Sequence, residues 1–154
     1  MKFPILFIVA FFLFPGWSNA QSKSKIQKKF LTELNTILKN TNQHHWNYEG
    51  KMKIDSAFQI NKKGVLSVTV SYKTDSTSTK VKMEAPFNKI KSVDYDLYLI
   101  LFFEENDVTI SETFKENPER NNQYKTNLFH IGIPREDGPL VKDQLQKMVD
   151  QFSE

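Results

Sequence analysis

The chain has 154 residues, a formal net charge of +3 and no cysteine. Without cysteine it has no disulfide, no thiolate metal site and no catalytic thiol, so packing alone must stabilise its single predicted domain. The small net charge gives no indication of a nucleic-acid partner, and we expect none. The chain also lacks an Asn-X-Ser/Thr acceptor, which together with the missing cysteines favours a bacterial protein.

The first twenty residues have the pattern of a secretory signal peptide. Lys2 precedes an almost uninterrupted apolar stretch from Phe3 to Phe14, and the small residues Ser18 and Ala20 occupy the positions that a signal peptidase reads. The apolar stretch is shorter than the roughly 20 residues that a membrane-spanning helix needs. We therefore expect cleavage after Ala20, a single globular domain over 21–154 without a transmembrane segment, and a secreted or periplasmic location.

Residues 22–41 are predicted to form an amphipathic helix. Its apolar residues recur at three- and four-residue spacing and so form one stripe: Ile26, Phe30, Leu34, Ile37 and Leu38. Ser24, followed three residues later by Gln27, resembles a capping box and predicts where the helix begins.

From Lys51 the apolar period changes to two, which indicates half-buried strands. Residues 51–60 and 66–73 alternate in this way, and Asn61-Lys62-Lys63-Gly64 between them suits a hairpin turn. A third strand, 80–86, ends at Pro86, because proline cannot donate to a sheet. Residues 87–93 are interpreted as a bend followed by a short strand.

The centre of the core is predicted at Asp94–Phe103. Leu97 to Phe103 are all apolar or aromatic, and carboxylates lie on both sides of the run. Such a run is typical of one strand covered on both faces, which would separate Asp94 from Glu104 by about 33 Å. The remaining predicted elements are a strand at 108–114, a long loop at 116–123, a last strand at 124–134 and a helix at 139–153.

These elements predict an α+β fold: an N-terminal helix (21–41), a six- to seven-stranded antiparallel meander (51–134) and a C-terminal helix (139–153). Strands joined by short turns curl, or close into a barrel, to protect their edges. Each helix has one apolar face and must pack it on the sheet.

Seven strands followed by a C-terminal helix resemble the pleckstrin-homology-like (PH-like) barrel. The segment Ile90-Lys91-Ser92-Val93-Asp94-Tyr95-Asp96-Leu97-Tyr98-Leu99 is similar to the mid-barrel strands of small secreted bacterial proteins of that shape. The chain departs from the family by a helix at the front, by the absence of Trp from the last helix and by the absence of a clear Lys/Arg motif for phosphoinositides. Lys62 and Lys63 lie in the turn where such domains bind phosphates. The resemblance, from about Lys51 to Phe152, implies a fold but no ligand.

Aromatic residues and lysines are the candidates for a binding site. Aromatic rings give contact area at a small entropic cost, and lysines on outward strand faces can form a basic surface for an anionic partner. The candidates are Trp46, Tyr48, Tyr95, Tyr98, Lys80, Lys82, Lys89 and Lys91. They favour an exported, non-enzymatic binding module for an envelope or extracellular protein, a polymer, or a small apolar ligand held between helix and sheet.

The sequence contains no nucleophile motif, phosphate loop or zinc motif, and we expect no cofactor and no metal. His44 and His45 are adjacent, so on an extended chain they point to opposite faces and suit chelation poorly. Two alternative functions stay open. One is a secreted inhibitor or immunity-type partner protein, and the other is an extracytoplasmic hydrolase whose acid and base are Asp94 and Asp96, or His130 and Glu136.

Overall fold

The computed structural model describes residues 16–41, 48–134 and 137–153. In these residues an α-helix at each end flanks eight β-strands and two short 3-10 helices. The elements are α1 (Gly16–Asn40), β1 (Lys51–Ile60), β2 (Val65–Lys73), β3 (Ser78–Pro86), η1 (Phe87–Lys89), β4 (Ile90–Asp96), β5 (Tyr98–Phe103), β6 (Val108–Phe114), η2 (Pro118–Arg120), β7 (Asn122–Thr126), β8 (Leu128–Gly132) and α2 (Gly138–Ser153). The predicted α+β class is confirmed.

The strands form two antiparallel sheets. The five-stranded sheet has the order β1-β2-β3-β6-β7, and the three-stranded sheet has the order β4-β5-β8. The chain leaves the first sheet after β3, forms the β4–β5 hairpin in the second sheet, and returns as β6. The antiparallel meander is therefore interrupted once, and the two sheets do not form a closed barrel.

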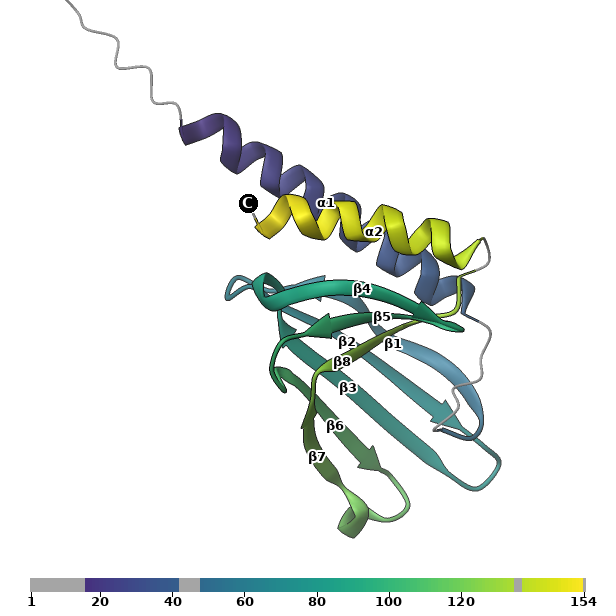
Figure 1. The fold of residues 1–154 in the computed structure, drawn as a ribbon. Helices are drawn as coiled ribbons and strands as arrows, with labels where there is room; N and C mark the ends of the chain where they lie inside the picture. Colours follow the sequence, from purple (N-terminus) through teal and green to yellow (C-terminus); the bar gives the residue numbers. More distant parts are fainter. Residues whose placement is uncertain (1–15, 42–47, 135–136, 154) are drawn as a thin grey trace, which may run out of the picture.

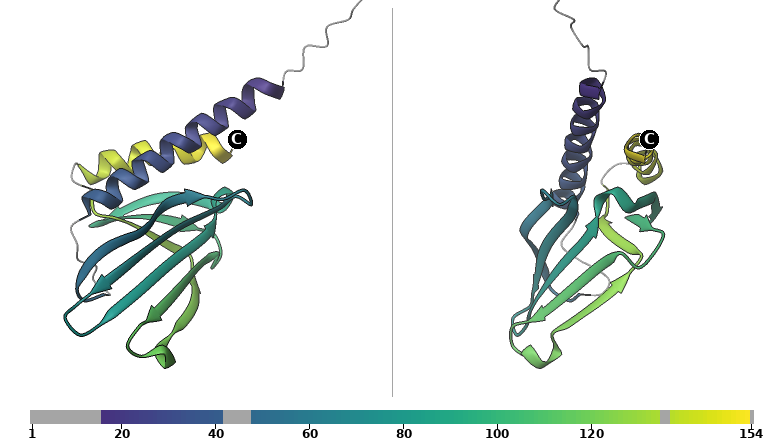
Figure 2. Two further views of the ribbon diagram at one scale, coloured as in Figure 1. Left: turned by 180° about the vertical axis from the view of Figure 1, so that it is seen from behind. Right: turned by 90° about the vertical axis from the view of Figure 1, so that its left-hand side faces the viewer.

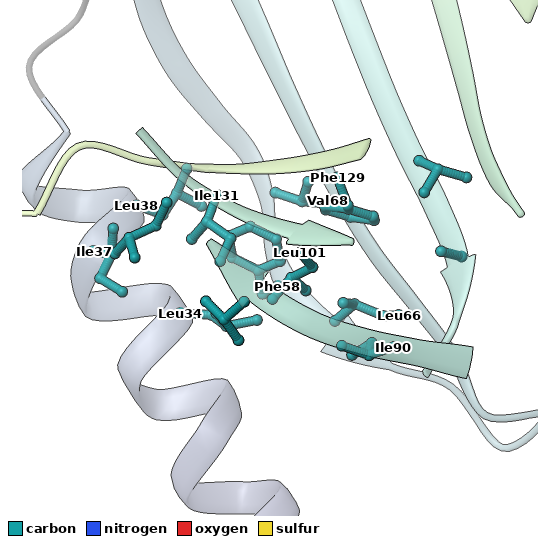
Figure 3. Packing of buried hydrophobic residues seen from close by; sticks show 14 of the residues in the cluster. Leu34, Ile37, Leu38, Phe58, Leu66, Val68, Ile90, Leu101, Phe129 and Ile131 are labelled. Carbon is teal, nitrogen blue, oxygen red and sulfur yellow. The ribbon is translucent and has the colours of Figure 1, made fainter. Parts of the chain in front are cut away.

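The two helices lie side by side over the same end of both sheets (Figures 1 and 2). α1 contacts β1 and β8, whereas α2 lies mainly on β4. Figure 3 shows Leu34 and Leu38 of α1 pointing toward Phe58, Leu101 and Ile131 of the sheets. The predicted apolar stripe of α1 is thus part of the core. Neither helix, over the residues described, combines the length and the apolar character that crossing a bilayer requires.

The start of α1 differs from the prediction. The helix begins at Gly16, upstream of Ser24, so the capping box predicted at Ser24 and Gln27 is wrong. Neither proline nor glycine follows Gly16 before Ser24, so nothing in the sequence stops the helix from extending there. α1 therefore runs across the predicted cleavage point after Ala20. Among the side chains of α1 that the structure describes, from Lys23 onward, Phe30 is the first that is buried.

The predicted single strand Asp94–Phe103 is wrong, because the chain reverses at Leu97. Leu97 has a φ of 62°, and β4 pairs with β5 so that Tyr95 lies opposite Leu99. A left-handed conformation is uncommon for leucine, and neither Gly nor Asn occupies the turn. Asp94 and Asp96, which favour turns, precede it, but the prediction placed them at the start of the strand. The reversal brings Lys91 Nζ within 3.6 Å of Glu104 Oε2. The wide separation predicted for the two ends of the run therefore does not hold.

The burial of β5 also differs from the prediction. Leu99, Leu101 and Phe103 are buried, whereas the alternate residues Tyr98 and Ile100 are only half-buried. The strand is thus covered fully on one face. The other face, which is also apolar, is only partly covered by the rest of the described chain.

The predicted last strand, Tyr124–Pro134, is also two strands. β7 belongs to the five-stranded sheet and β8 to the three-stranded sheet, and only Asn127 separates them. The backbone carbonyl of Asn127 accepts a hydrogen bond of 2.9 Å from the amide of Phe103. Phe129 and Ile131 are buried, as their spacing predicts. The chain crosses from one sheet to the other at this residue.

Candidate functional site

An apolar cavity of about 200 Å³ lies between the inner face of the five-stranded sheet and β8. The side chains around it come from β2, β3, β6, β7, β8 and the residue Tyr48, which precedes β1. They are Tyr48, Val70, Tyr72, Val81, Met83, Ile110, Tyr124, Thr126, Leu128 and His130. A smaller space of about 30 Å³ adjoins it on the side of α1 and shares Val70, Tyr72, Met83 and His130 as walls.

The strand period explains why these residues meet. Val70 and Tyr72 occupy inward positions of β2, and register pairs Val70 with Val81 of β3. Register also pairs Met83 of β3 with Ile110 of β6. Directly opposite residues of an antiparallel pair point to the same face, so three neighbouring strands together form one apolar wall.

A hydrogen-bonded carboxylate lies beside the cavity. Glu112 takes an inward position on β6, opposite Val81. The hydroxyl of Tyr48 donates to its Oε1 at 2.5 Å, and the hydroxyl of Tyr124 donates to the same oxygen at 3.4 Å. The ring of Tyr48 also stacks on Tyr72, with centroids 4.8 Å apart. Two tyrosines are thereby fixed at the cavity wall by one acid.

The phenols of this group stay protonated. Burial, followed by the hydrogen bond to Glu112, raises the pKa of Tyr48 well above its ordinary value. Burial is also the main cause that raises the pKa of Tyr72 and the pKa of Tyr124. All three hydroxyls therefore remain hydrogen-bond donors at any physiological pH.

His130 adds a polar group to the wall. It lies on β8, half-buried, with its ring edge-on to Tyr98 at a centroid distance of 6.5 Å. Burial lowers the pKa of His130 below its ordinary value. The neutral imidazole, which is favoured at pH 7, offers one N–H donor and one acceptor nitrogen.

The structure brings together some of the predicted site residues. Tyr48 lines the cavity, and Tyr98 lines the adjoining space of about 30 Å³. Tyr95 lies elsewhere, against Gly138 at the start of α2, where an added Cβ would overlap its ring. Trp46, with His44 and His45, falls outside the described residues.

The four predicted lysines occupy two settings. Lys80 and Lys82 are exposed on the outer face of β3. Lys89 and Lys91 lie at η1 and β4, where Lys89 pairs with Asp107 at 2.9 Å and Lys91 with Glu104 at 3.6 Å. Lys82 is also paired, with Glu84 of the same strand at 2.8 Å, so of the four only Lys80 forms no ion pair with the described part of the chain.

The residues predicted for a hydrolase form two alternative pairs. Asp94 and Asp96 are exposed at alternate positions of β4, where the carboxylate of Asp94 accepts a hydrogen bond from the amide of Tyr95. His130, the acid or base of the other pair, lies on β8. Glu136 lies outside the described residues. Over the described ranges, no group of three His, Asp or Glu side chains is arranged to hold a metal.

Sequence reasoning missed Tyr72, Glu112 and Tyr124. A signal for Glu112 was present: Val108, Ile110 and Phe114 share one face of β6, and Glu112 occupies the same face. A carboxylate at an inward position needs hydrogen-bond donors, because burial without them is costly. Tyrosines are suitable donors, and two of them meet it here.

Comparison of the chain with protein-family models, curated proteins and solved structures gave no match. The resemblance to the PH-like barrel therefore stays a prediction. Function has to be inferred from the cavity and from the charges on the surface.

Proposed function

We propose that this protein is an exported, non-enzymatic binding module that holds a small apolar ligand in the cavity between the five-stranded sheet and β8. The observation that carries the proposal is an apolar cavity with a few converging polar groups, which is the usual form of a small-molecule site. The exported location rests on the signal-peptide pattern of residues 1–20.

The size of the cavity limits the ligand. An engineered cavity of about 150 Å³ in another protein accommodates benzene. The cavity of about 200 Å³ therefore suits a single ring with small substituents, or a short branched chain. Val70, Val81 and Ile110 offer such a body aliphatic contacts, and burial of its surface gives roughly 25 cal/mol per Å².

The polar groups limit the ligand further. The lining combines the hydroxyls of Tyr48 and Tyr124, both bonded to Glu112, with the neutral imidazole of His130. A ligand with one hydroxyl or carbonyl group and an apolar body matches a lining of this composition. A strongly charged ligand does not suit these walls, because they would not replace its hydration.

The test uses three neutral probes of this size: indole, p-cresol and cyclohexanol. Thermal unfolding of the purified protein is followed as each probe is added, and methyl NMR signals report where it binds. A ligand that binds only the folded state stabilises it by about 2.7 kcal/mol at a concentration 100 times its Kd. We expect at least one probe to raise the Tm and to shift the methyl signals of Val70 and Met83.

A pair of variants locates the binding. Met83→Trp places a large ring in the cavity, whereas Lys82→Trp places the same ring on the outer face of the same strand. Met83→Trp should abolish the effect of the probes, and Lys82→Trp should retain it, with circular dichroism confirming that both are folded. Val81→Phe serves if Met83→Trp does not fold. Equal responses in folded variants, or no response to any probe in the original protein, would contradict the proposal.

A further inference from the structure

A second hollow lies on the outer face of the five-stranded sheet and is unrelated to the cavity. It has a volume of about 340 Å³, and its walls consist of charged and hydroxyl side chains. They are Lys53, Asp55, Ser71, Lys73, Ser78, Lys80, Thr113 and Lys115. We refer to these eight residues as the basic groove.

Strand register builds the groove as two parallel rows. In one row Ser71 of β2 lies between Lys53 of β1 and Lys80 of β3, and Lys80 lies opposite Thr113 of β6. Lysines and hydroxyls thus alternate from strand to strand. Ser71 is only 5% exposed, because the long side chains on both sides of it stand above the sheet and make it the floor of the groove.

The second row is richer in lysine and does not alternate in the same way. Lys73 of β2 lies between Lys51 of β1 and Ser78 of β3. The carbonyl of Ser78 accepts a hydrogen bond of 3.0 Å from the amide of Lys115, which follows β6. Lysines two strands apart lie about 10 Å from each other. The groove therefore presents several ammonium groups together with the hydroxyls of Ser71, Ser78 and Thr113.

The groove has four lysines and one carboxylate of its own, Asp55, and a second carboxylate, Glu116, accepts a hydrogen bond of 2.7 Å from the amide of Ser78. Of its four lysines, Lys53 pairs with Asp55 at 3.6 Å, and the other three form no ion pair with the described part of the chain. Lys51 and Lys73 even lie directly opposite each other, an arrangement that is destabilising in a sheet. Lys89 and Lys91, by contrast, each have a carboxylate partner. Bound anions would relieve this repulsion.

We propose that the basic groove binds an anionic polysaccharide. Ammonium groups suit the carboxylates or sulfates of such a polymer, and the hydroxyls of Ser71, Ser78 and Thr113 suit its sugar hydroxyls. No aromatic residue of the described chain lines the groove, so nucleic-acid bases have no ring on which to stack. No apolar residue lines it either, so a lipid surface finds no anchor there.

The binding test uses polygalacturonate, which carries one carboxylate on each sugar, and neutral dextran as its control. Lys73→Glu/Lys80→Glu reverses two charges in the groove. The matched control is Lys62→Glu/Lys63→Glu, which makes the same change of net charge in the exposed β1–β2 turn. All four lysines are exposed, so the Tm of both variants should stay close to that of the original protein.

We expect polygalacturonate to bind the original protein, dextran not to bind, and added salt to weaken the complex. The groove variant should lose about tenfold or more of the affinity, and the turn variant much less, because only the former repels the polymer at close range. Equal losses in the two variants would show a response to net charge alone and overturn the proposal. Tighter binding to duplex DNA or to phosphatidylserine vesicles would overturn it too.

The groove and the cavity are tested independently. Lys80 points to the outer face of β3, and its neighbour Val81 points to the inner face. Loss of polysaccharide binding in the groove variant should leave the response to the neutral probes unchanged. A failure of either proposal therefore does not decide the other.

Discussion

Tyr48 and Glu112 join two distant parts of the chain across the wall of the cavity. Tyr48 lies just before β1, at one edge of the five-stranded sheet, and Glu112 lies on β6, beyond β2 and β3. The phenol donates to the carboxylate, and the ring lies flat on Tyr72 of β2. The hydrogen bond gives the inward-pointing carboxylate of Glu112 a donor. It also holds Tyr48, which precedes β1, against the inner face of the sheet.

Replacing Glu112 by leucine should destabilise the protein. The change removes the acceptor of the hydroxyls of Tyr48 and Tyr124 in a partly buried place, and a polar group left without a partner costs about 1–3 kcal/mol. Urea unfolding measures the loss. The double variant Tyr48→Phe/Glu112→Leu lacks the Tyr48 hydroxyl as well as its acceptor. Its loss of unfolding free energy should therefore be smaller than the sum of the losses of the two single variants. Strict additivity would show that the two side chains do not interact.

Stability should depend on pH through His130. Burial lowers the pKa of His130 in the folded state, so the unfolded chain binds more protons near its ordinary pKa of about 6.5. The free energy of unfolding should therefore rise as pH increases from the lowered pKa to about 7. Replacing His130 by Gln should flatten this part of the curve, as measured by urea unfolding at a series of pH values. An equally steep rise in His130→Gln would assign the dependence to other groups.

Replacing Leu97 by glycine should stabilise the protein. Leu97 has a φ of 62° and is 72% exposed, so it bears the strain of a left-handed conformation and contributes little burial. Relief of that strain is worth about 1 kcal/mol. Leu97→Ala removes the exposed side chain but keeps the strain, and it should bring little gain. If both variants gain equally in thermal unfolding, the backbone is not the cause.

Replacing Asn35 by alanine should loosen the attachment of α1 to the sheet. The side-chain amide of Asn35 donates to the carbonyl of Phe58 at 3.0 Å and its oxygen accepts from the amide of Phe58 at 2.8 Å. These bonds satisfy backbone groups of β1, an edge strand. Their loss should cost about 1–3 kcal/mol in urea unfolding. Thr36→Ala, on the exposed face of the same helix turn, should change stability far less.

The strands with a clear period of two could be predicted from the sequence. In β1 to β3 the apolar residues at alternate positions share the inner face, and the turn before β2 has a glycine with positive φ. The β4–β5 reversal was not predicted, because its left-handed residue is a leucine, the first residue of a continuous apolar run. The change of sheet at Asn127 was not predicted either, since a single residue separates the two strands and neither Gly nor Pro lies at the crossing.

The candidate site could be predicted only in part. Tyr48 and Tyr98 stand out as aromatic residues beside strands, and both line the cavity or its extension. The cavity itself depends on the distance between two sheets, which no local pattern contains. The basic groove also depends on register, because it joins lysines of four separate segments of the chain.

The most direct test of the central claim is native mass spectrometry of the protein isolated gently from its own host. We expect a complex heavier than the chain by one small neutral molecule, and we expect Met83→Trp, prepared in the same way, to lack it. A bare chain in both preparations, together with no response to the neutral probes, would contradict a ligand in the cavity.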